Sequence, residues 1–274
     1  MTKANRILLK ARRHIVGDRI GNNGSMFRGE GYDFTELREY TSGDDVRHIN
    51  WNVTAKMGKP YVKVFRQERE INVICGVMLG GNLSFGDKLE TLGLVVSIIG
   101  YSAVANGDPF GCCRFIDRSC DFTLPSKKNF VVANTLQSIL ETPIIGKKTD
   151  LSYAMNELYK RIKRRSLIVL VGDFFELPQL KLLAKKHEVV AIVVRDIGEE
   201  KPTLQGYNAL IDPESGAHIE GDFGQGTLQK YTQNLQKHDA QLFEIFRTSG
   251  VRATKLYTHN NPAVVLRRLF EERA

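Results

Sequence analysis

The sequence has few of the residues from which disulfides and soft-metal sites are built. Its four cysteines, Cys75, Cys112, Cys113 and Cys120, form no Cys-x-x-Cys pair, which argues against a zinc site. Cys112 and Cys113 are adjacent in a predicted strand, so we expect them to face opposite sides of a sheet as small buried residues. The six histidines are scattered and form no His-Glu-x-x-His pair. The cysteines and histidines therefore indicate neither a catalytic centre nor a metal centre.

Catalytic motifs and membrane-crossing runs are missing as well. The sequence contains no Gly-x-Ser-x-Gly elbow, and Gly80-Gly81 lacks the Lys-Ser/Thr pair of a P-loop. No apolar run reaches the roughly 20 residues that cross a bilayer. The first residues are not followed by the apolar segment of a secretion signal. We therefore expect a non-enzymatic, cytoplasmic protein without a transmembrane segment, and leave peripheral membrane association open.

The chain has fewer acidic than basic residues. The chain has 39 Lys and Arg against 31 Asp and Glu, a formal net charge of +8 and a pI near 9.3. The densest basic cluster, residues 160–165, precedes an apolar strand and suits the C-terminus of a helix. Because no aromatic residues are interleaved with it for base stacking, an acidic protein or a membrane surface fits this charge better than a specific nucleic-acid sequence.

What the chain does contain is an alternation of apolar strands with amphipathic helices. Nearly continuous apolar runs at 71–79, 167–171 and 189–194 are typical of central parallel strands. Further strands are predicted at 110–116 and 251–257, an antiparallel edge at 120–124, and helices at 89–105, 130–140, 151–163, 177–187, 228–248 and 262–272. This pattern predicts an α/β fold, with a mostly parallel central sheet covered by helices on both faces.

Two domains are expected from this pattern. Residues 71–274 form the α/β domain, with a hairpin insertion near residues 207–222. Residues 1–70 form a small, partly β N-terminal module, with a short helix over 2–13 and a strand over 61–66.

Residues 28–51 mix acids, bases and aromatics too closely for an apolar core to use them all. Asp45 is expected to cap a helix over 46–55, whose apolar stripe buries one face and which carries the single tryptophan. Arginines in this stretch are within reach of carboxylates for planar two-point pairing. One interpretation is an ion-pair network that holds the small module together, and the other is a docking surface for a partner. The candidate binding residues are Arg28, Glu30, Asp33, Arg38, Asp44, Asp45, Arg47 and Trp51.

These residues also carry a resemblance to a known family. Arg-Gly-Glu-Gly-Tyr-Asp-Phe at 28–34, Gly-Asp-Asp-Val-Arg at 43–47 and Ile-Asn-Trp at 49–51 resemble the signature of the bacterial domain-of-unknown-function family 58 (DUF58). Weaker blocks at 107–111, 149–151, 171–174 and 211–216 follow in order, so the resemblance covers nearly the whole chain. It implies a von Willebrand factor A-like, Rossmann-type fold. It also implies a partnership with a MoxR-type AAA+ ATPase and its client protein.

The resemblance further implies where a magnesium site would lie. Von Willebrand factor A domains hold the ion with an Asp-x-Ser-x-Ser loop, a threonine and an aspartate. Here the first loop aligns with residues 78–82, where Met78 takes the place of the carboxylate. Of the two hydroxyls nothing is left but the glycines Gly80 and Gly81 and the amide of Asn82, while Thr149 and Asp173 persist. Magnesium needs such hard oxygen ligands, so we expect a degenerate site without metal or other cofactor. Thr149 is then expected to cap a helix, and Asp173 to accept bonds from backbone amides at a strand end.

The sequence therefore predicts a non-catalytic adaptor or scaffold for protein–protein interaction. Its expected role is with a MoxR-type AAA+ ATPase, in the assembly or maturation of client proteins. A metal-dependent protein-binding domain is the main alternative, and a basic nucleic-acid-binding protein is the weaker one.

Overall fold

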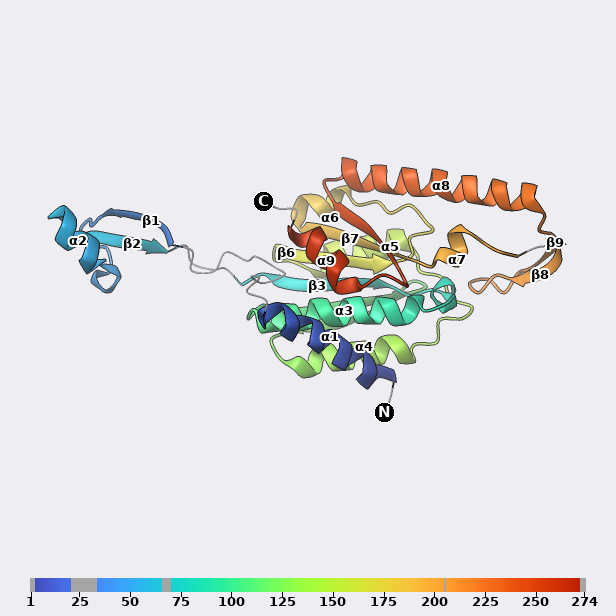
Figure 1. Cartoon of the computed structure of the whole chain (residues 1–274), viewed down its shortest axis with the longest axis horizontal. Coiled ribbons are helices and arrows are strands. Elements are labelled where there is room, and N and C mark those ends of the chain that lie inside the picture. The colour runs from blue at the N-terminus through green and yellow to red at the C-terminus, as the bar shows by residue number, and fades with distance from the viewer. Residues whose placement is uncertain (1–2, 21–33, 66–69, 205, 272–274) are drawn as a thin grey trace. The chain divides into compact units, whose positions relative to one another are not determined.

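The computed structural model describes residues 3–20, 34–65, 70–204 and 206–271. It divides the chain into two units, residues 1–27 together with 71–274, and residues 28–70. The larger unit is built on a six-stranded sheet (Figure 1). Its strands are β3 (Asn72–Met78), β4 (Phe110–Ile116), β5 (Ser119–Ser126), β6 (Ser166–Gly172), β7 (Glu188–Arg195) and β10 (Arg252–Tyr257).

The strand order is β10-β7-β6-β3-β4-β5, and only β5 runs antiparallel to its neighbour. This confirms the predicted α/β, von Willebrand factor A-like fold with a mostly parallel sheet, and the antiparallel edge at its predicted place. β3 and β6 are buried along almost their whole length because helices cover both of their faces. Cys112 and Cys113 lie in separate core clusters on opposite faces, as predicted from their adjacency.

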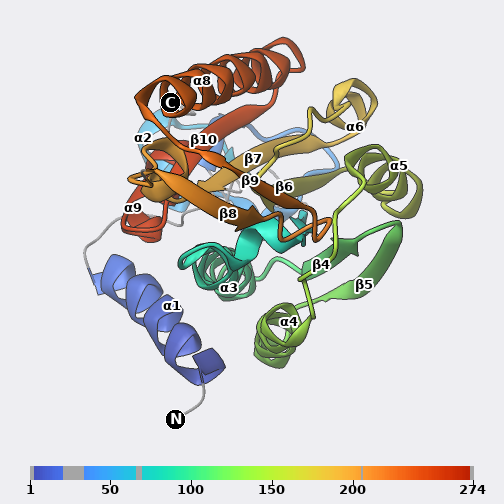
Figure 2. The ribbon, with the colours of Figure 1, turned by 90° about the vertical axis from the view of Figure 1, so that its right-hand side faces the viewer.

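The helices form one layer on each side of the sheet (Figure 2). One face is covered by α1 (Lys3–Ile20), α3 (Lys88–Ala105), α4 (Asn129–Glu141) and α9 (Pro262–Glu271). The other is covered by α5 (Leu151–Arg161), α6 (Lys181–Lys186) and α8 (Gln225–Thr248). The predicted helix over 177–187 is shorter than expected, because Pro178 precedes the first helical turn.

Helix α3 is the central element of its layer. Among the described helices it alone is long and apolar enough, by length and composition, to cross a membrane. In the structure 72% of that stretch is buried, and it packs against the sheet and against helices α1 and α4.

Helix α1 corrects the predicted domain boundary. The expected module of residues 1–70 included this helix, whereas α1 packs on α3 and belongs with the sheet unit. Ile7 and Ala11 are buried, and Lys3 pairs with Glu90 at 2.6 Å. The apolar contact of this helix with α3 thus decides its unit, rather than its nearness in sequence to the module.

The smaller unit contains β1 (Phe34–Glu39) paired antiparallel with β2 (Tyr61–Phe65), the short η1 helix (Val46–His48) and α2 (Trp51–Met57). The predicted single helix over 46–55 is therefore wrong. Ile49 is extended, with ψ near 128°, and Asn50 begins a new helix by accepting from the amide of Val53. Asp45 does cap the first turn, where its carboxylate accepts from the amide of Arg47.

Two further features complete the larger unit. The predicted insertion is a hairpin of β8 (Tyr207–Ile211) and β9 (His218–Asp222), which pair only with each other. The short helices η2 (Gly81–Ser84) and α7 (Ile197–Glu200) follow β3 and β7 at the carboxyl ends of the strands. In open α/β sheets these strand ends are where ligands bind.

Candidate functional site

The residues of the family-like stretch pair with one another in the smaller unit. Both terminal nitrogens of Arg38 donate hydrogen bonds to the carboxylate of Asp44, at 2.9 and 2.7 Å. Arg47 makes the same kind of two-point contact with Asp45, at 2.7 and 3.1 Å. These hydrogen bonds hold the pKa of each carboxyl below its ordinary value, with the arginine side chain as the main cause in both. Two arginines and two aspartates of the candidate set are therefore brought together as ion pairs.

The remaining candidates divide into one exposed residue and three that lie outside the described residues. Trp51 is 69% exposed at the start of α2, so its indole is available for contact. Arg28, Glu30 and Asp33 belong to the stretch that the structure does not describe.

The loop after β3 lies at the carboxyl ends of the central strands, where the resemblance placed a degenerate metal site. Gly80 and Gly81 are buried there, and the amide of Gly81 donates to the carbonyl of Lys147 at 2.8 Å. Asn82 is the second residue of the η2 turn that starts at Gly81. In this loop the backbone, rather than side-chain oxygens, makes the contacts.

Thr149 has a different role from the predicted one. Its hydroxyl donates to the carbonyl of Leu79 at 2.6 Å and lies 3.1 Å from that of Phe115. The cap of α5 is Asp150, whose carboxylate accepts from the amide of Tyr153 at 2.8 Å. Thr149 therefore joins the ends of β3 and β4, while the next residue starts the helix.

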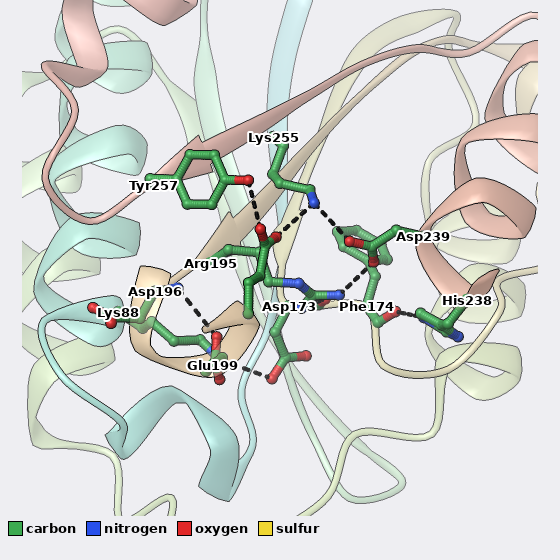
Figure 3. A network of polar contacts seen from close by, with 11 residues as sticks. Lys88, Asp173, Phe174, Arg195, Asp196, Glu199, His238, Asp239, Lys255 and Tyr257 are labelled. Carbon is green, nitrogen blue, oxygen red and sulfur yellow. Dashed lines mark hydrogen bonds and ion pairs between the residues drawn. The ribbon is translucent and has the colours of Figure 1, made fainter. Parts of the chain in front are cut away.

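A lysine that the sequence analysis did not single out occupies this region. Lys88 is fully buried, and its ammonium lies 2.7 Å from Glu199 and 3.7 Å from Asp173 (Figure 3). Glu199 is held by a capping box, because its second oxygen accepts from the amide of Asp196 at 3.1 Å. No backbone amide donates to Asp173 within the described residues, contrary to expectation, and its own carbonyl accepts from Arg195.

A second layer of charge lies behind this ammonium. Arg195 is fully buried and pairs with Asp239 at 3.0 Å. Lys255 bridges Asp239 and Glu200, both at 2.6 Å, and Tyr257 donates to Glu200 at 2.8 Å (Figure 3). Neighbouring cations and the hydrogen bonds from Lys255 and Arg195 keep the pKa of Asp239 below its ordinary value despite burial. Cations and carboxylates alternate through the network, so each buried charge has a partner.

The tip of the β8–β9 hairpin covers the glycine pair. A Cβ atom added to Gly81 would lie 2.0 Å from the carbonyl oxygen of Pro213, and one added to Gly80 would lie 2.9 Å from the Glu214 carboxylate. The same Pro213 carbonyl accepts from the amide of Gly146 at 2.8 Å. The glycines are thus required by close approach of the hairpin, which accounts for the loss of side chains in this loop.

A cavity of about 70 Å³ remains between the hairpin tip and the strand ends. Its wall includes Thr149, Asp173, Glu176, Lys148 and Glu214. Burial first, and the nearby charge of Asp173 next, raise the pKa of Glu214 to about 7. Oδ2 of Asp173 is buried without a hydrogen-bond partner in the described structure.

The described residues contain no group of three or more His, Cys, Asp and Glu side chains arranged to hold a metal ion. What the strand ends contain is a cation supplied by the chain itself. The sequence analysis did not identify Lys88, Arg195 and Glu214 as site residues. Their local sequence indicates only a helix start, a strand end and a turn, respectively. The Asp196-x-x-Glu199 capping pattern was the one local signal for this site.

A family model matches most of this chain, and curated relatives match it in sequence. The family model described as "Protein of unknown function DUF58" matches residues 36–241. Uncharacterized proteins of Mycobacterium tuberculosis and Mycobacterium bovis are each 26% identical over 257 residues, covering 89% of this chain and 79% of theirs.

Among solved structures the chain is similar to a conserved hypothetical protein, BatB, from Bacteroides thetaiotaomicron, with 12% identity and a TM-score of 0.43, covering 74% of this chain and 98% of that one. It is also similar to an aerotolerance-related membrane protein from Bacteroides fragilis, with 12% identity, a TM-score of 0.41 and the same coverage of both chains.

Proposed function

We propose that this chain, which belongs to the DUF58 family, is a non-catalytic adaptor for protein–protein interaction. In this proposal its partner is a MoxR-type AAA+ ATPase, which it assists in the assembly or maturation of client proteins. The association with the ATPase rests on the family resemblance.

The observation that carries the proposal is the filled cation position at the strand ends. Lys88 contributes a buried ammonium beside Asp173 and Glu199, at the place where a metal-dependent relative would hold its ion. This resident cation offsets the charge of both carboxylates without an external ligand, although it hydrogen-bonds only Glu199 of the two. Recognition then falls to protein surfaces of the chain.

The family-like stretch supports such a surface. Tryptophan and arginine are enriched among residues that dominate binding energy. Trp51 is exposed, and the Arg47–Asp45 pair precedes it by a few residues in the sequence. We place the ATPase contact on these residues.

The experiment is co-purification of the chain with a MoxR-type AAA+ ATPase from a bacterium that encodes both, together with the rate of ATP hydrolysis. We expect Trp51→Ala and Arg38→Ala to weaken binding about tenfold or more. Met57→Ala, which removes a 60% exposed side chain from the same helix, should bind as the native chain does.

Circular dichroism would establish that each variant folds. Normal binding by Trp51→Ala and Arg38→Ala would move the contact elsewhere. No binding and no change in hydrolysis rate with the native chain would reject the partnership.

A metal-dependent adaptor is the second candidate, and the unpartnered Oδ2 of Asp173 is the observation that favours it. Calorimetric titration with magnesium or manganese separates the two. We expect no heat of binding, because the Lys88 ammonium lies 3.7 Å from this carboxylate and would repel a divalent ion. Heat that disappears in Asp173→Ala would establish the metal-dependent mode instead.

A further inference from the structure

An apolar groove lies on the sheet face covered by α5, α6 and α8. Its volume is about 460 Å³. Met155, Leu180 and Leu183 line it and are almost fully buried, whereas Leu182 and Tyr159 on its rim are 62% and 40% exposed. The last turn of α8 forms the remaining wall. Apolar side chains of this size at an exposed rim are typical of a surface that another molecule covers.

The groove is surrounded by most of the chain's excess positive charge. Residues 151–165 and 181–186, which are α5, the loop after it and α6, contain eight Lys and Arg and a single acid, Glu157, in a chain whose net charge is +8. Glu157 is already paired with Arg161 at 2.8 Å. Six of these cations have no ion-pair partner among the described residues: Lys163, Arg164, Arg165, Lys181, Lys185 and Lys186.

Contacts between α5 and α6 hold basic residues of the two helices close to each other. Lys186 donates to the carbonyl of Tyr159 at 2.8 Å, and its ammonium lies 4.6 Å from the centre of the Tyr159 ring. The end of α6 is thereby fixed against the end of α5, and the two helices lie side by side (Figure 2). Lys186 therefore lies at the end of α5, which residues 163–165 follow closely in the sequence, and Lys181 lines the groove itself.

We propose that this groove binds an acidic amphipathic helix of a partner protein. The apolar face of the helix fills the hollow between Leu182 and Tyr159, and its carboxylates meet the unpaired lysines and arginines at the rim. A concave apolar surface fits a helix better than it fits a flat anionic bilayer. The inference rests on the proposed adaptor function and names the kind of segment that the adaptor recognises.

The test uses the full chain and a fluorescent designed peptide of about 15 residues, long enough to form a helix on binding. The peptide carries leucine along one face and glutamate on both flanks, and a second peptide carries lysine in place of glutamate. Fluorescence anisotropy should show binding of the glutamate peptide only. Binding should weaken as salt rises toward roughly 1 M, where the Debye length falls to about 3 Å.

Substitutions on the groove have matched controls elsewhere on the chain. We expect Leu182→Asp and the pair Lys181→Glu/Lys185→Glu each to weaken peptide binding about tenfold or more. Leu124→Asp changes a leucine that is 71% exposed on β5, and Lys237→Glu changes an exposed lysine of α8. Both controls should bind as the native chain does.

The inference would be overturned if the lysine peptide bound as well as the glutamate peptide, or if neither peptide bound. It would also be overturned if the chain bound phosphatidylglycerol vesicles but neither peptide, and Leu182→Asp abolished the vesicle binding. Dimerisation of the chain that Leu182→Asp disrupts would assign the groove to a second copy. If the chain still bound the ATPase in any of these cases, the proposed function would stand. If the chain bound the glutamate peptide but not the ATPase, the proposed ATPase partnership would be rejected and the helix-binding groove would stand.

Discussion

Lys88 is a full positive charge enclosed by the structure, and its neighbours decide what that charge does. Two carboxylates, Glu199 of α7 and Asp173 after β6, face its ammonium. Breaking a buried pair by removing one partner is costly, because the remaining charge stays buried without compensation. The lysine is therefore expected to stabilise the whole strand-end region.

We predict that Lys88→Met lowers the free energy of unfolding by about 3–5 kcal/mol. Urea denaturation measures this change. The control Lys181→Met, at an exposed lysine on α6, should change it by less than about 0.5 kcal/mol. The double variant Lys88→Met/Glu199→Gln should recover part of the loss, since it also removes one unpaired carboxylate. Native-like stability of Lys88→Met would show that the ammonium does not hold this site together.

Glu214 is the residue through which pH acts on the hairpin tip. Its pKa is raised from 4.5 to about 7 by burial first and by Asp173 next, and Lys148 opposes the shift while Asp212 and Glu176 add to it. The folded state therefore binds more protons than the unfolded state between these two pKa values. The free energy of unfolding must fall as pH rises through that window.

We predict that Glu214→Gln removes this fall. Between about pH 5 and pH 8 the free energy of unfolding of the native chain should fall by roughly 1–2 kcal/mol relative to that of Glu214→Gln. This is less than the full pKa shift would give, because the carboxyl is half-exposed and solvent screens it. Urea midpoints at a series of pH values provide the measurement. Glu220→Gln, at an exposed carboxyl of β9, should follow the native chain. Parallel curves for all three proteins would place the titration of Glu214 near its ordinary value.

At the scale of elements, the hairpin tip packs closely on the loop after β3 because that loop has glycines at the point of contact. Pro213 and Glu214 approach the glycine pair more closely than any Cβ atom allows. The hairpin strands pair only with each other, so the contacts of the tip hold the element in place. Overpacking at this contact must move the tip.

We predict that Gly81→Ala displaces the tip. Exchange of the Gly146 amide proton, which is bonded to the carbonyl of Pro213 at 2.8 Å, should accelerate about tenfold or more. Gly226→Ala on α8, where an added Cβ meets nothing within 4 Å, is the matched control and should leave it unchanged. Unaltered exchange in Gly81→Ala would mean that the loop, and not the hairpin, gives way.

At the scale of the whole molecule, the sheet unit is assembled from two separate stretches of chain. Helix α1 packs on α3 and α4, although the smaller unit intervenes in the sequence. Arg12 lies 5.0 Å from the ring centre of Tyr101 on α3. Folding of the sheet unit therefore includes residues that precede the family-like stretch.

We predict that Ile7→Ala, which empties a site that is 3% exposed, lowers the free energy of unfolding by about 2–4 kcal/mol. Leu9→Ala, at a 43% exposed position of the same helix, should cost less than about 1 kcal/mol. Thermal or urea unfolding of the full chain measures both. Equal effects of the two substitutions would indicate that α1 is not packed on the sheet unit.

The sequence by itself determined the elements of the larger unit. The β4 strand, the β8–β9 hairpin and the order of strands and helices all followed from local periodicity and apolar runs, which depend on neighbouring residues alone. The antiparallel edge and the opposite faces of Cys112 and Cys113 followed from the same local geometry. The family-like stretch was visible because its residues are contiguous.

Only the tertiary structure decided what those elements hold between them. Lys88, Asp173 and Glu199 come from three distant segments, and they meet because β3, β6 and β7 are neighbours in the sheet. The exposure of Trp51 and the docking of α1 on α3 likewise depend on which faces are covered. Local patterns fix secondary structure, whereas burial and charge pairing depend on contacts between residues far apart in the chain, which no single segment encodes.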